Sequence, residues 1–120
     1  MKRELKFRAW DSVNKVMELN VHHLDSLNEI LYKEKYNVMQ FTGLKDKEGT
    51  EIYEGDILEG ISNNEFSKGN INNYEVIWSQ DSWHIIGTWF SLQELINYCN
   101  NKVKVIGNIY ETPNIHRRRS

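Results

Sequence analysis

The chain has 120 residues and a net charge of −2 at pH 7, and 39% of its residues are hydrophobic and 12% aromatic. This length supports one domain with one core, and the apolar content excludes a chain that is disordered by composition. The apolar runs are too short to cross a membrane or to act as a secretion signal, and the single cysteine excludes an internal disulfide and a cysteine-built zinc site. We therefore expect a soluble protein of the cytoplasm.

The first segments of the chain predict a β-hairpin followed by a short helix. Residues 5–10 alternate between apolar and polar side chains with period two, and 16–19 return as a second strand. Residues 11–15 between them are typical of a turn. Leucines spaced along 24–32 share one side of a helix and predict a short one there.

The middle of the chain predicts further strands separated by glycine turns. Residues 38–42 and 50–53 read as two strands joined by a turn at 46–49, where Gly49 is suited to a positive φ. A new strand begins at 57–59, after Gly55 and Asp56, whose carboxylate can accept a hydrogen bond from a nearby backbone amide. The polar stretch that follows, 60–73, predicts a loop.

The last part of the chain predicts a hairpin, a helix and a final strand. Residues 75–78 and 83–86 form the two arms of the hairpin. Ser91 and Glu94 have the spacing of a capping box, and the apolar residues after them share a face that includes Cys99, so a two-turn helix is expected. Residues 103–109 alternate as a strand. The whole pattern favours a mainly β, small, SH3-like, partly open barrel with one or two short helices.

Three blocks of sequence bracket nearly the whole chain: residues 6–11 (KFRAWD), 40–57 (QFTGLKDKEGTEIYEGDI) and 105–111 (VIGNIYE), the last followed by Pro113. Together they resemble the YopX family of phage and prophage proteins from low-G+C Gram-positive bacteria. The resemblance implies a β-rich, SH3-like barrel with appended helical parts that assembles as a homo-oligomer. It carries over no catalytic residue, cofactor or metal. We assign residues 1–113 to a single domain and 114–120 to a basic, flexible C-terminal tail.

The candidate binding surface consists of basic and aromatic side chains on the first and last strands. Period two places Lys6, Arg8 and Trp10 on one face of the first strand, an arrangement that suits phosphate contact and base stacking with single-stranded nucleic acid. Lys102 and Lys104 have the same spacing near the last strand. If the first and last strands pair, these basic side chains form one patch. The alternatives are a solvated strand face with Trp10 in a second apolar cluster, and edge lysines that discourage aggregation.

Other chemistry-bearing residues give weaker signals. The acids Glu51, Glu54, Asp56 and Glu59 lack the spacing of a calcium loop and predict a solvated acidic edge. Adjacent histidines, such as the pair at 22–23, diverge on a strand or a helix and so rarely share one metal ion. We find no catalytic constellation in the sequence, and we expect a protein that is not an enzyme.

Four tryptophans are more than the core of one small domain requires, and those left outside would mark an interface. They stand at positions 10, 78, 83 and 89. The main hypothesis is therefore a protein-interaction or self-assembly module, a homo-oligomer with a possible host or phage partner protein. The alternative is a single-stranded nucleic-acid-binding module that uses the first strand and the tail arginines at 117–119. The acidic stretch at 44–66 disfavours the second, because phosphate binding requires positive potential.

Overall fold

The computed structural model describes residues 5–19, 21, 33–62, 69–79, 82–86 and 90–116, and within these ranges the chain is mainly β. The first sheet has the strand order β2-β1-β3-β4 and consists of β1 (Phe7–Asp11), β2 (Val16–Glu18), β3 (Tyr36–Lys45) and β4 (Glu51–Tyr53). The second has the order β7-β6-β5-β8 and consists of β5 (Asp56–Ile61), β6 (Ile71–Ser79), β7 (Ser82–Ile85) and β8 (Val103–Asn108). Neighbouring strands run antiparallel.

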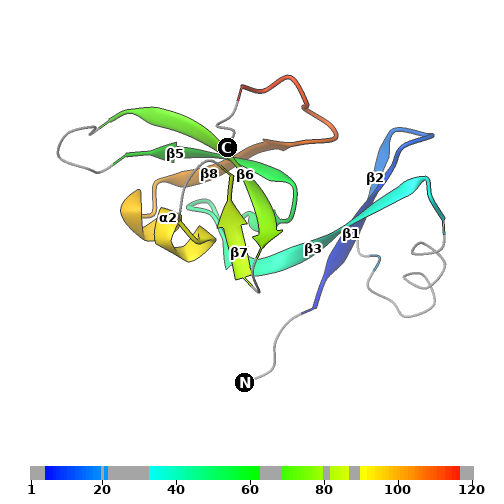
Figure 1. The fold of residues 1–120 in the computed structure, drawn as a ribbon, viewed down its shortest axis with the longest axis horizontal. Coiled ribbons are helices and arrows are strands. Elements are labelled where there is room, and N and C mark those ends of the chain that lie inside the picture. Colours follow the sequence, from blue (N-terminus) through cyan, green and yellow to red (C-terminus); the bar gives the residue numbers. More distant parts are fainter. Residues whose placement is uncertain are drawn as a thin grey trace.

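Backbone hydrogen bonds between the two sheets curl them into a small, partly open barrel (Figure 1). The turn between β3 and β4 lies against β8, where the Lys47 N–H donates to the Val103 carbonyl at 3.1 Å. Farther along the chain, the Gly55 N–H donates to the carbonyl of Val76 in β6 at 2.9 Å. The predicted mainly β, barrel-like fold class is therefore confirmed.

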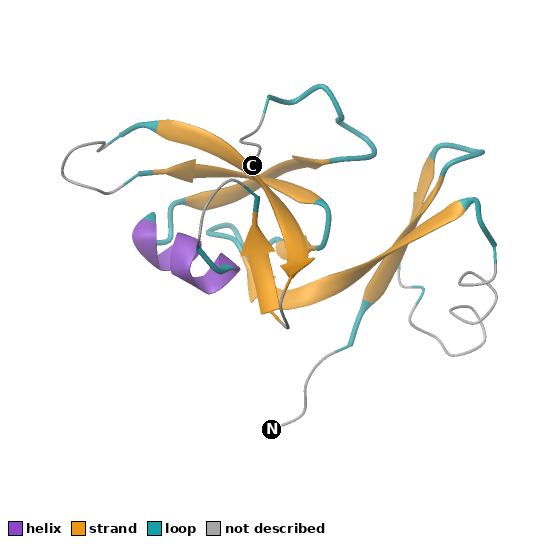
Figure 2. Cartoon of the chain, in the orientation of Figure 1, coloured by secondary structure: helices purple, strands orange, loops and turns teal. Residues whose placement is uncertain are grey.

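The helix α2 (Leu92–Tyr98) packs beside the second sheet and completes the main core (Figure 2). The predicted capping box is present: Ser91 Oγ accepts from the Glu94 N–H at 3.1 Å, and Glu94 Oε1 accepts from the Ser91 N–H at 3.0 Å. Cys99 is buried directly after the helix, as expected. The buried core residues come from both sheets and from α2 and its C-terminal end: Ile52, Leu58, Tyr74, Val76, Ile85, Leu92, Leu95, Ile96, Cys99 and Val103.

A second unit, which we call the wing, consists of β1, β2 and the first half of β3 and stands away from the remainder of the domain, the body (Figure 1). It lengthens the molecule to 49 × 38 × 27 Å. One face of the wing carries a small apolar cluster centred on Ala9 and Val21. Its other face packs on the body, so the long strand β3 belongs to both units.

Two of the expected elements need comment. The segment 60–73 is not entirely a loop, because β5 runs to Ile61 and β6 begins at Ile71, with Gly60 paired to Asn72. Backbone pairing of Gly60 with Asn72 and of Ile61 with Ile71 extends both strands into this polar stretch. The helix expected at 24–32 lies outside the described residues.

The turn between β1 and β2 is built around the carboxylate of Asp11. Its Oδ1 accepts from the N–H groups of Val13 and Asn14 at 3.0 and 2.9 Å, and Lys35 Nζ lies 3.3 Å from Oδ2. The backbone N–H of Asn14 is the largest cause that lowers the pKa of Asp11 to about 2, and Lys35 adds to it. These bonds hold the hairpin turn that the sequence predicts at 11–15.

The lowered pKa of Asp11 predicts a loss of stability in acid. Between its ordinary pKa and about 2, the unfolded chain binds a proton at Asp11 that the folded chain does not, so stability falls as the pH falls through this window. We expect the urea midpoint to drop between about pH 5 and about pH 2.5, and to drop less in the Asp11→Asn variant. Equal drops in the two proteins would contradict this role for Asp11.

Candidate interaction surfaces

Arg8 in β1 and Lys6 directly before this strand lie on one face, as the sequence predicts, and this face points toward the body. Lys6 Nζ is 2.6 Å from Glu51 Oε2 and 5.6 Å from the centroid of the Phe41 ring. Arg8 Nη2 is 2.6 Å from Asp56 Oδ1, and its guanidinium lies 4.7 Å from the centroid of the Tyr53 ring. Both cations therefore have an anionic and an aromatic partner within the chain.

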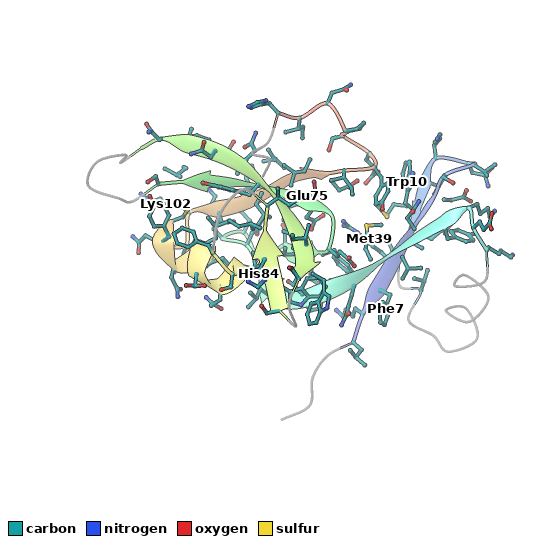
Figure 3. All side chains as sticks on the ribbon, viewed as in Figure 1. Phe7, Trp10, Met39, Glu75, His84 and Lys102 are labelled. Atoms are coloured by element: carbon teal, nitrogen blue, oxygen red, sulfur yellow. The ribbon has the colours of Figure 1, made fainter. Side chains whose placement is uncertain are left out.

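Trp10 is the third residue of this face and is only 8% exposed. Its ring stacks on that of Tyr110, which follows β8, with the centroids 6.1 Å apart and an interplanar angle of 18°. Figure 3 places Trp10 and Met39 between the wing and the body. Trp10 therefore lies in a contact between β1 and the segment after β8, and little of its surface faces solvent.

The Arg8–Asp56 pair is the most buried charged contact of this face, with 11% and 1% of the two side chains exposed. Burial raises the pKa of the Asp56 carboxyl, while Arg8 and the Tyr53 N–H, which donates to Oδ2 at 2.7 Å, act to lower it. The predicted bond from a backbone amide to Asp56 is confirmed, but Asp56 does not lie on a solvated acidic edge. It joins the wing to the body instead.

Lys102 and Lys104 lie far from the first-strand residues. Because β1 and β8 belong to different sheets, the first and last strands do not pair, and the condition for a single basic patch is not met. Lys102 is exposed, and Lys104 Nζ is 3.6 Å from Glu48 Oε1 across the contact between β8 and the β3–β4 turn.

That contact brings Lys45, the last residue of β3, and Lys47 of the turn close to β8. Lys45 and Lys47 flank Asp46, whose Oδ2 accepts from the Val105 N–H at 2.9 Å. The sequence analysis did not identify these lysines as candidates. The many acids around them in the chain indicate an acidic segment and give no sign that the lysines lie near β8. The signal that would have found them is the Lys-Asp-Lys pattern, in which the turn uses the central carboxylate and leaves both flanking cations exposed.

Trp78 and Trp83 form the most exposed aromatic contact of the described residues. They face each other across the β6–β7 hairpin, with the ring centroids 4.7 Å apart at 69°. Trp78 is 46% exposed, while Trp83 is half-buried and packs against the main core. The Trp83 Nε1 atom is buried, and no described residue accepts a hydrogen bond from it.

Several expected candidates contribute nothing further. Burial raises the pKa of the Cys99 thiol, consistent with a core residue. The described ranges contain no group of three or more His, Cys, Asp or Glu residues that could hold a metal ion. No helix of the described part is long and apolar enough to cross a membrane. The histidines at 22–23, the tryptophan at 89 and the arginines at 117–119 lie outside the described residues.

These features define a small, mainly β, barrel-like protein whose basic first strand is engaged within the chain. A family model described as "YopX protein" matches residues 6–115. The chain therefore belongs to the YopX family.

Among solved structures, the chain is similar to the crystal structure of protein EF1440 from Enterococcus faecalis. The TM-score is 0.71 and the sequences are 26% identical, over 94% of this chain and 98% of that chain. No curated protein matches this chain.

Proposed function

We propose that this protein is a non-enzymatic phage or prophage accessory protein that acts in the cytoplasm of the bacterial host by binding protein, either copies of itself or a host or phage partner. The surface that carries this proposal is the aromatic end, which we define as Trp78 and Trp83 at the end of the β6–β7 hairpin. Exposed aromatic side chains that stack on a packed core are the usual centre of a protein interface.

The exposure of Trp78 is the observation that supports this proposal. Tyr74, Val76 and Trp78 alternate along β6 and so share the face that the core uses. The first two are 6% and 0% exposed, whereas Trp78 is 46% exposed. The row of core side chains therefore continues past the covered part of the barrel, and a partner surface on Trp78 would remove its apolar area from water.

The single-stranded nucleic-acid alternative receives less support from the same contacts. Lys6 and Arg8 would have to leave Glu51 and Asp56 to contact phosphates, and Trp10 would have to leave Tyr110 to stack on a base. Each exchange gives up an existing contact for a new one, so little net affinity results.

The experiment compares wild type with the Trp78→Ser variant by light scattering at about tens of micromolar. If the chain self-assembles through the aromatic end, wild type gives a multiple of the 14.3 kDa chain mass and the variant gives a smaller mass. Losing a central tryptophan should cost about 2–4 kcal/mol of association free energy, or roughly 30- to 700-fold in Kd.

Two controls make the result specific. Trp10→Phe keeps an aromatic ring against Tyr110 and should leave the mass unchanged. If wild type is a monomer, a pull-down from host cells with and without nuclease tests for a separate partner. A protein that is captured despite nuclease, and lost in the Trp78→Ser variant, would support the proposal. Capture that nuclease abolishes would favour the nucleic-acid alternative, and capture of nothing would reject both forms of binding.

A further inference from the structure

The outer edge of β2 is open. This strand stands at the end of the first sheet, and β1 is its one partner among the described strands (Figure 1). Both edges of the second sheet are covered: Ser91 forms a bridge with His84 of β7, and the Lys47 N–H donates to the Val103 carbonyl of β8. The edge of β2 lacks such a cover, and an uncovered strand edge is a place where another strand can add.

The backbone of Met17 points toward this open edge. The Lys6 carbonyl, directly before β1, accepts from the Phe41 N–H of β3. Backbone bonds alternate along an antiparallel pair, so Arg8 and Trp10 also bond to β3, and the odd-numbered residues of β1 bond to β2. Met17 stands opposite Trp10, so its N–H and C=O point away from β1. No described residue bonds to either group.

Apolar and charged side chains flank the open edge. Val13, Val16 and Leu19 are 69%, 46% and 66% exposed, and they are half of the exposed large hydrophobic side chains of the described residues. Lys15 directly precedes β2 and Glu18 ends it. Both are exposed, and neither has an ion-pair partner in the described part of the chain. The edge therefore carries opposite charges at its two ends and apolar surface around them.

This pattern is complementary to itself. When two copies of β2 lie antiparallel about a twofold axis between their Met17 residues, each Met17 N–H can donate to the Met17 carbonyl of the other copy. In this register Lys15 of each copy lies nearer to Glu18 of the other copy than either residue lies to its own counterpart. Opposite charges on neighbouring strands attract, so the charges favour the same register as the backbone.

We propose that the open edge of β2 is a self-pairing site, at which a second copy of this chain adds its own β2 and joins the two wings in one continuous sheet. The proposal does not rest on the aromatic end, because Trp78 and Trp83 belong to the β6–β7 hairpin of the body. A copy that used both surfaces would contact two neighbours, so its assembly would exceed the mass of a dimer.

The first test removes the backbone donor of Met17. Met17→Pro deletes the outward N–H and leaves the bonds between β2 and β1, since a proline is tolerated where the N–H of an edge strand faces solvent. Met17→Ala is the matched control, because it shortens the side chain and keeps the N–H. In sedimentation velocity between about 10 µM and about 1 mM, we expect wild type to dimerise. Met17→Pro should associate roughly tenfold or more weakly than Met17→Ala, since each dimer loses two hydrogen bonds.

The second test reverses the charges at the ends of the edge. Lys15→Glu and Glu18→Lys each bring like charges together, so each variant should associate with itself roughly threefold or more weakly than wild type. Mixed in equal amounts, the two variants regain opposite charges at both ends. They should then associate with each other more tightly than either does with itself. A change that acted only by weakening the hairpin would not be reversed by mixing.

Two controls separate this site from general charge effects and from the aromatic end. Ile71→Glu changes a residue of the body that is 60% exposed, and it should leave the association within about twofold of wild type. A dimer that persists in Trp78→Ser and is lost in Met17→Pro supports the β2 edge even where the proposed function fails. The inference is overturned if wild type stays a monomer at about 1 mM, if Met17→Pro and Met17→Ala associate equally, or if mixing the charge variants gains nothing.

Discussion

Replacing Asp56 with alanine is expected to lower the free energy of unfolding by about 3–5 kcal/mol, the usual cost of removing one partner from a buried ion pair. The change leaves the largely buried Arg8 guanidinium without the Asp56 carboxylate as its ion-pair partner. It also removes the acceptor of the Tyr53 N–H. Urea unfolding followed by tryptophan fluorescence measures the loss.

A double-mutant cycle gives this prediction its control. Asp56→Asn retains an oxygen for the Tyr53 N–H, and Arg8→Met retains apolar volume over the Tyr53 ring. The double variant removes both charges together, so it should lose less stability than the two single changes predict by addition. Additive losses, or an Asp56→Ala variant within about 0.5 kcal/mol of wild type, would contradict a stabilising buried pair.

Replacing Asp46 with alanine is expected to lower the free energy of unfolding by about 2–4 kcal/mol, because three backbone N–H groups lose a charged acceptor at once. Two of these groups belong to the turn itself, and the third belongs to Val105 in β8. The same side chain therefore shapes the turn and attaches it to the second sheet. Chemical denaturation of the variant and wild type at neutral pH measures the difference.

The neighbouring Glu48 offers a matched control for Asp46. Its side chain is exposed and makes only a 3.6 Å ion pair with Lys104, so Glu48→Ala should change stability by less than about 1 kcal/mol. Asp46→Asn keeps one acceptor oxygen and should fall between the alanine variant and wild type. An Asp46→Ala variant that is no less stable than Glu48→Ala would show that the Val105 bond adds little.

The elements that the sequence predicted well are those decided by neighbouring residues. The capping box at Ser91 depends on two side chains three positions apart, and the Gly49 turn depends on a conformation that glycine adopts with little strain. The alternation of Lys6, Arg8 and Trp10 on one face was likewise readable, because successive side chains of a strand point to opposite sides.

The local sequence pattern does not predict which residues cover that face of β1. Whether the side of β1 that carries Arg8 meets solvent depends on where Asp56 and Tyr110 lie, and both are distant in the chain. The contact of Lys47 with Val103 depends in the same way on the β3–β4 turn reaching β8. Period and spacing fix which residues share a face, whereas long-range packing fixes what covers it.

The internal partners of β1 have a consequence for folding during synthesis. Asp56 leaves the ribosome 48 residues after Arg8, which at about 5–20 residues per second corresponds to a delay of roughly 2–10 s. Tyr110 follows later still, and so does β8, which pairs with β5. Lys6 and Arg8 therefore remain hydrated, and the Trp10 indole remains exposed, until almost all of the described chain has been translated. A chaperone can bind the first strand during this period.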